Sequence, residues 1–293
     1  MLARVVRRLS KEASILGIAL VGSRSKGIHT EHSDFDLLIL TRGKKSEERF
    51  YENGHFIDVI FVPLDSLSLQ MREEICLGGI LYDPYGVLAK LKRADVRKIR
   101  RLRLEDLMRE ARLHVAFSRA YLRRGKEEDA LAHAILGAWE ASRFLVEFLG
   151  SPYDRTRGLL YLGIASRRLL DVDFSSPYRR ILRLDGDFPD KFEYLREACK
   201  HLSTLGEPLY GSPFFLAGVK RRVLDIASFS DLEASRYVME CLAERWEDHP
   251  CPSIGTAIRE CLGNVDFHET ISLVSSFVEL ASTVRVKNKR GFE

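Results

Sequence analysis

Short apolar runs separated by polar segments fill the first hundred positions of the chain. Three runs have the length of buried strands, and the flanking segments show helical spacing or turn residues. The polar segment 41–54 is interpreted as a connection. The predicted strands are 15–22, 34–40, 55–63 and, with a turn, 78–86; the predicted helices are 2–13 and 64–77.

The pattern changes near residue 100, and apolar residues then recur at the spacing of amphipathic helices. The predicted helices are 102–122, 129–149, 156–170, 190–204, 213–228, 231–247, 254–262 and 267–283. The first two have a short connection and should pack antiparallel. No strand is predicted beyond Gly150. We therefore expect an α+β fold, with a mixed-sheet domain over 1–100 and an all-helical domain over 101–293.

Charge and cysteine content exclude few classes of protein. The chain has 293 residues, which allows two domains, and a net charge of only +4. That balance argues against a surface built wholly for nucleic acid. The basic run 90–103 could hold RNA or triphosphate, but it lacks interleaved aromatics, and a solvated linker helix is the favoured interpretation. Five cysteines without a C-x-x-C pair predict a reduced, cytoplasmic protein, and no early apolar run is long enough for a membrane.

The stretch "LVGSRSKGIHTEHSDFDLLIL", residues 20–40, carries the first candidate chemistry. Gly22 ends a buried strand and allows a sharp turn close to a ligand. Ser23, with Arg24 and Lys26 beside it, could bind phosphate oxygens. A helix predicted over 25–30 would direct its positive N-terminal end to the same anion.

Acidic residues follow this turn at a strand start. Asp34 and Asp36 point to the same side of an extended strand, where they would repel each other without a cation. Asp58 is the one charge in the apolar segment "FIDVIFV", a costly position unless the carboxylate is paired or coordinated. If these strands are neighbours, three carboxylates could hold two Mg²⁺ ions. Each feature alone is common in turns and on solvated faces, and their conjunction is what favours a site.

The stretches "GSRSKG", "SDFDLLIL" and "IDVIFV" together resemble the nucleotidyltransferase superfamily of DNA polymerase β. The likeness covers about residues 1–90, and "GGILYDPYG" looks like the end of such a domain in small prokaryotic members. The resemblance implies transfer of a nucleoside monophosphate from an NTP, with release of pyrophosphate. It also implies that Gly22 and Ser23 bind the triphosphate, that Asp34, Asp36 and Asp58 bind metal, and that Asp58 assists deprotonation of the acceptor.

The domain layout is similar to that of kanamycin and lincosamide nucleotidyltransferases, in which the helices shape the acceptor site. Glu105, Asp106 and Glu110 lie in the corresponding first helix. Glu110 is taken as the candidate base, although a solvated helix face also explains it. Tyr82 and Asp83 are candidate acceptor contacts, and a simple turn explains them equally well.

The function expected from these features is Mg²⁺-dependent nucleotidyl transfer to a hydroxyl of a small molecule, with ATP as the expected NTP. One alternative is a protein AMP-transferase of the antitoxin type, and RNA also stays open as an acceptor. Another alternative is a catalytically silent nucleotide sensor or scaffold. Three retained acids argue against the silent alternative, since paired carboxylates are costly without a cation.

Overall fold

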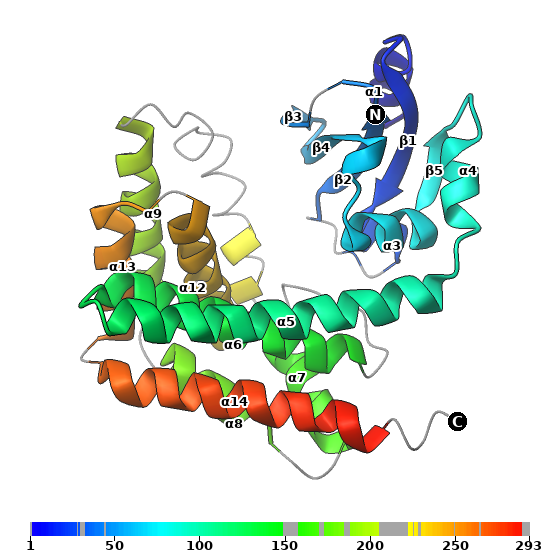
Figure 1. Ribbon diagram of the computed structural model, residues 1–293. Helices are drawn as coiled ribbons and strands as arrows, with labels where there is room; N and C mark the ends of the chain where they lie inside the picture. The colour runs from blue at the N-terminus through cyan, green and yellow to red at the C-terminus, as the bar shows by residue number, and fades with distance from the viewer. Residues whose placement is uncertain are drawn as a thin grey trace. The chain divides into compact units, whose positions relative to one another are not determined.

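The computed structural model of the chain forms two compact units, Met1–Arg103 and Leu104–Glu293 (Figure 1). The residues that the structure describes are 2–27, 29, 33–43, 45–148, 158–169, 173–184, 188–204, 222–224, 226–227, 230–248, 250–263 and 265–288. The first unit contains the sheet, and the second is helical throughout its described part. No helix among the described residues is both long enough and apolar enough to cross a membrane.

A five-stranded mixed sheet forms the centre of the first unit. The sequence predicted a mixed sheet, but only four of its strands. Its strands are β1 Ile15–Val21, β2 Phe35–Thr41, β3 Ser46–Glu52, β4 His55–Pro63 and β5 Gly79–Tyr82. Their order is β3-β4-β2-β1-β5, and β2 and β4 are parallel while the other pairs are antiparallel. Strand β2 is therefore the central strand of the sheet, with β4 on one side and β1 on the other.

Helices cover both faces of this sheet. The helices of the unit are α1 Leu2–Leu9, α2 Gly22–Ser25, η1 Leu64–Ser66, α3 Leu69–Leu77 and α4 Val87–Lys92. On one face α1 packs against Leu37 and Ile39 of β2, and on the other α3 and α4 pack against Leu38 and Leu40. Because both faces are buried, β2 reads as a continuous apolar run, which is why it was predictable.

The strand β3 corrects one sequence interpretation. Segment 41–54 was interpreted as a connection, but its second half forms β3 and a hairpin with β4. Asn53 and Gly54 join the two strands with φ angles of 51° and 82°, the positive values that favour Asn-Gly in tight hairpins. The strand "SEERFYE" lies at the edge of the sheet and is mostly polar, so it lacks the apolar signal of a buried strand.

The second unit is a helical assembly built around α6. Its helices are α5 Val96–Leu122, α6 Glu127–Phe148, α7 Gly158–Leu169, α8 Ser175–Leu182, α9 Phe188–Thr204, α12 Asp231–Asp248, α13 Pro252–Leu262 and α14 Phe267–Asn288. Helices α12, α13 and α14 all contact α6, and most residues of α6 are buried. The sequence did not predict α8, and the predicted helix 213–228 lies largely outside the described residues.

Two further features of these units bear on stability. Ser118 of α5 donates to the carbonyl of Ala130 of α6 at 2.6 Å, and Ala111 faces Gly137, so these two helices are antiparallel as expected.

In the basic run, Arg103 forms an ion pair with the buried Glu73. At least one cation of that run therefore serves packing within the first unit.

Candidate active site

The glycine turn lies directly against one of the candidate metal ligands. Gly22 has a φ of +71°, and a Cβ placed on it would lie 2.1 Å from Oδ2 of Asp36. Glycine is therefore required at this position for both conformation and space. The adjacent helix α2 is Gly22–Ser25, so it begins earlier than the predicted helix 25–30, of which Ile28 and Thr30 fall outside the described residues.

This short helix changes the expected mode of anion binding. A helix of only four residues has few aligned peptide dipoles, so a helix macrodipole contributes little here. Individual groups are the better candidates: the backbone N–H of Gly22 and the ammonium of Lys26. Both of these donors bind the same carboxylate in this structure, that of Glu74.

Glu74 lies on α3 and was not identified from the sequence. Its Oε2 accepts a hydrogen bond from the N–H of Gly22 at 3.2 Å, and its Oε1 contacts Nζ of Lys26 at 2.5 Å. The side chains of Lys26 and Glu74 are mostly buried, at 18% and 16% exposure. A carboxylate thus sits at the point where a phosphate oxygen was expected, and no local sequence pattern connects positions 52 residues apart.

The acids of β2 and β4 are brought together by strand register. Asp36 pairs with Asp58 across the parallel strands, so the two side chains project from the same face of the sheet. Asp34, just before β2, is 8% exposed. The three aspartates predicted from the motif therefore belong to two adjacent strands, Asp34 just before β2, Asp36 at its start and Asp58 within β4.

A guanidinium group connects two of these acids. Arg49 of β3 lies opposite Asp58 in register, and its Nε and Nη2 bind both oxygens of that carboxylate. Its Nη2 also lies 3.8 Å from Oδ2 of Asp34. The positive charge expected beside the acids is thus supplied by a residue of the strand that sequence analysis missed. The Asn53-Gly54 turn, which ends four residues before the lone acid Asp58, was the available signal.

Arg24 contacts the segment that precedes β2. Its guanidinium donates to the carbonyl of Ser33 at 2.9 and 2.6 Å, and it lies 3.9 Å from the ring centre of Phe35. These contacts tie the two ends of the segment between α2 and β2. Arg24 therefore holds the start of β2, which carries the aspartates, near the glycine turn. Its role in nucleotide binding stays a prediction.

The weaker candidates for acceptor contacts lie in different units. The carboxylate of Asp83 accepts hydrogen bonds from the N–H groups of Leu88 and Ala89 at 3.2 and 2.8 Å, which caps α4. Tyr82 belongs to β5. Glu110 of α5 is partly exposed and forms an ion pair with Arg109. The cap gives Asp83 a structural role, and its role toward an acceptor, like those of Tyr82 and Glu110, stays a prediction.

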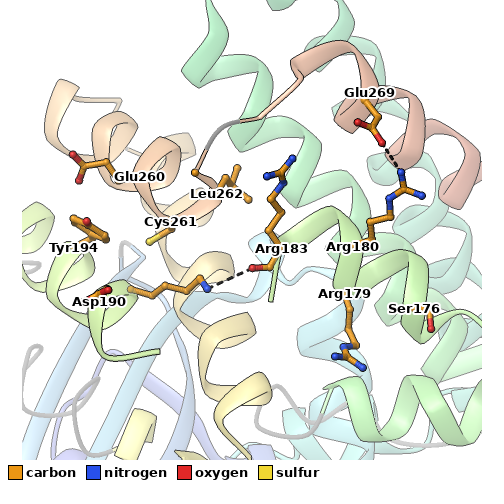
Figure 2. A pocket seen from close by; sticks show the side chains of 12 residues that line it. Ser176, Arg179, Arg180, Arg183, Asp190, Tyr194, Glu260, Cys261, Leu262 and Glu269 are labelled. Carbon is orange, nitrogen blue, oxygen red and sulfur yellow. Dashed lines mark hydrogen bonds and ion pairs between the residues drawn. The ribbon is translucent and has the colours of Figure 1, made fainter. Parts of the chain in front are cut away.

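The helical unit contains a pocket of about 850 Å³ that the sequence did not indicate (Figure 2). Helices α8, α9, α13 and α14 supply its lining, which is rich in charge. Figure 2 shows Arg180 paired with Glu269. Nζ of Lys191 lies 3.5 Å from the carbonyl oxygen of Arg183. A small molecule would fit this volume.

Comparison with known proteins agrees with the geometry of the first unit. Residues 2–103 match the family model of the nucleotidyltransferase domain. No curated protein matches the chain. Among solved structures, a nucleotidyltransferase-like protein from Exiguobacterium sibiricum 255-15 aligns over 84% of this chain and 81% of its own, with 16% identity and a TM-score of 0.37. The family match, together with the glycine turn and the three aspartates, identifies residues 2–103 as a nucleotidyltransferase domain of the polymerase β-like superfamily.

Proposed function

We propose that the protein transfers a nucleoside monophosphate from an NTP, with ATP as the expected donor, to a hydroxyl group of a small molecule. The observation that carries this proposal is the register of β2 and β4, which pairs Asp36 with Asp58 beside the Gly22 turn. Binding of a triphosphate next to a set of carboxylates is the arrangement that phosphoryl transfer requires.

The acids have the chemistry of a magnesium site. Arg49 already places one cationic group between Asp34 and Asp58, so this location accepts positive charge. Carboxylate oxygens are the ligands that Mg²⁺ prefers. We assign Asp34, Asp36 and Asp58 as the residues that would hold it. When bound, Mg²⁺ would stabilise the negative charge of the attacking and leaving oxygens.

The glycine turn is assigned to the triphosphate. The N–H of Gly22 and the ammonium of Lys26 are donors that now bind Glu74, and a phosphate oxygen could take the place of that carboxylate. Ser23 and Arg24 lie on the same turn, where Ser23 could add a hydroxyl donor. In this proposal the Glu74 side chain withdraws as the nucleotide binds.

The reaction then requires one proton transfer and one displacement. The oxygen of the acceptor hydroxyl forms a bond to the α-phosphorus, and the bond from that phosphorus to the β-phosphate oxygen breaks, which releases pyrophosphate. The hydroxyl proton passes to a nearby base, and Asp58 is our candidate because its position in β4 directs it toward Asp36. Asp58 must first be released from Arg49.

Acceptor choice is assigned to the helical unit, because the residues assigned above account for the donor substrate alone. Glu110 is the residue of that unit to test for acceptor contacts, and Tyr82 and Asp83 are the residues of the first unit to test. The pocket lined by Arg183, Lys191 and their neighbours is a second place to test, since its volume suits a small molecule.

Transfer of an α-labelled phosphate tests the proposal. The protein is incubated with Mg²⁺ and each α-labelled NTP in turn, together with the small-molecule, RNA or protein fraction of a cell extract. We expect label in the small-molecule fraction and release of pyrophosphate. Label that reaches only RNA or only protein would replace the proposed acceptor by one of the alternatives.

A further inference from the structure

Two histidines and a glutamate from three helices meet in the helical unit. They are His114 of α5, His133 of α6 and Glu247 of α12. Nδ1 of His114 lies 2.9 Å from Nδ1 of His133, and Nε2 of His114 lies 3.9 Å from Oε1 of Glu247. One ligand atom from each of the three residues lies within 4.8 Å of the others.

The two contacts use different nitrogens of His114, so the separations that matter for one metal ion are those of the three ligand atoms, which lie within 4.8 Å of one another. Zn²⁺ is bound by histidine nitrogen and carboxylate oxygen at about 2.0–2.2 Å, so tetrahedral ligand atoms lie roughly 3.4 Å apart. Small side-chain rotations would bring the observed atoms to such spacings. Within the described part of the chain, no other group of three histidine, cysteine or acidic side chains meets this condition.

The aromatic residues around His133 hold its ring in a defined plane. Tyr121 stacks on it with the rings nearly parallel at 5.3 Å, and Phe117 lies 5.4 Å away. The His114 ring stacks on it at 5.2 Å. Metal-binding histidines need a fixed ring orientation, and stacking supplies it here.

The charge around the cluster favours a cation. Glu247 lies near four further carboxylates, those of Asp248, Glu140, Glu110 and Glu244. A bound divalent ion would offset this accumulation of negative charge.

We propose that His114, His133 and Glu247 bind a divalent transition-metal ion, represented by Zn²⁺, that links α5, α6 and α12. Two imidazoles and one carboxylate leave further coordination positions for water. Within the helical unit the ion would fix the relative positions of these three helices. The proposal concerns a site separate from the three aspartates, because all of its ligands belong to the unit Leu104–Glu293.

The test is metal binding by the full-length protein after removal of metals with a chelator. Zn²⁺ titration calorimetry, the visible spectrum with Co²⁺ and the Zn²⁺-dependent shift in melting temperature are measured together. We expect visible absorption bands of Co²⁺ bound to imidazole, and a rise in melting temperature when Zn²⁺ is added. His133→Gln and Glu247→Gln should each lower Zn²⁺ affinity by roughly tenfold or more. Substitution of a residue that only supports a metal ligand already lowers metal affinity by about that factor.

Two controls distinguish this site from other metal binding. His268 lies exposed near the start of α14, so His268→Gln removes a histidine outside the cluster. Asp36→Asn alters the proposed magnesium site instead. Both should keep the Co²⁺ bands and the Zn²⁺ affinity of the parent. The proposal is overturned if Glu247→Gln, a half-exposed position whose variant should fold, binds Zn²⁺ as the parent does, or if the parent binds none at micromolar Zn²⁺.

Discussion

Asp36 and Asp58 are direct partners in the parallel ladder between β2 and β4, and the carboxylate of Asp36 fills the space beside Gly22. One strand register therefore joins the glycine turn to two acids that are far apart in sequence. A shift of this register by one residue would move Asp58 to the opposite face of the sheet. The burial of Ile57 and Val59 on that opposite face stabilises the observed register.

Arg49 connects Asp34 and Asp58, so its removal should affect the metal-free protein most. Arg49→Met keeps much of the side-chain volume but leaves two mostly buried carboxylates without their shared cation. We expect a loss of about 2 kcal/mol in the free energy of unfolding without metal. Mg²⁺ should restore more stability in this variant than in the parent. Urea unfolding with and without Mg²⁺ measures both effects.

Arg7 provides the control for that substitution, because it is an exposed arginine of α1. Arg7→Met should change neither the unfolding free energy nor its Mg²⁺ dependence. An equal response to Mg²⁺ in Arg49→Met and the parent would show that Arg49 does not compete with a cation at the acids.

Glu74 accepts hydrogen bonds from the N–H of Gly22 and the ammonium of Lys26, the two donors that we assign to the triphosphate. Glu74→Gln removes the negative charge while it keeps the shape, so NTP should displace the side chain more easily. We expect nucleotide affinity to rise by up to about tenfold, the size of one charged hydrogen bond. Equilibrium binding of a fluorescent NTP measures it. Asp65→Asn, an exposed acid of the same unit, is the control. Weaker binding by Glu74→Gln would mean that Glu74 positions Lys26 for the nucleotide.

Gly22 and Gly27 form a matched pair for backbone strain. Their φ angles are +71° and +70°, but only at Gly22 would a Cβ collide with Asp36; at Gly27 nothing lies within 4 Å. Each alanine variant should cost about 1 kcal/mol for its left-handed conformation. Gly22→Ala should also displace Asp36 and lower kcat/KM by roughly a hundredfold. Steady-state kinetics with comparable losses in both variants would contradict a specific role for Gly22.

Arg236 is central to the stability of the helical unit. It is fully buried and binds Glu233 and Glu240 of its own helix, and Tyr178 donates to Glu240 at 2.7 Å. Arg236→Met should lower the free energy of unfolding by about 3–5 kcal/mol, because it leaves buried carboxylates without a cation. Arg196→Met, at an exposed ion pair of α9, should cost under about 1 kcal/mol. Thermal unfolding of the two variants compares these costs.

The parts of the fold that were predictable share a strong local signal. β1, β2 and β4 are apolar because both faces of the sheet are covered, and Asp58 was conspicuous as a charge in such a run. β3 was missed because an edge strand needs no continuous apolar run, although Asn53-Gly54 is a hairpin signal. At its described residues the predicted helix 25–30 differs from the structure, because α2 begins at Gly22 and ends at Ser25.

The candidate site was predictable only where residues follow a motif. The glycine turn and the three aspartates are recognisable from spacing, whereas Arg49 and Glu74 enter through pairing between elements. The position of Arg49 depends on the register between β3 and β4, and that of Glu74 on the packing of α3 against the sheet. Neither relationship has a periodic pattern or a fixed spacing that a single sequence could reveal.

The most direct measurement of the central claim compares nucleotidyl transfer by the parent and by Asp36→Asn. Both proteins receive the same Mg²⁺, the same α-labelled NTP and the same small-molecule extract, and transfer of label is followed over time. The variant should remain folded, because Asp36 is partly exposed at the strand start. Loss of a metal ligand should remove about 4 kcal/mol of transition-state stabilisation and slow transfer roughly a thousandfold. Transfer by Asp36→Asn at the rate of the parent would contradict the assignment of this site.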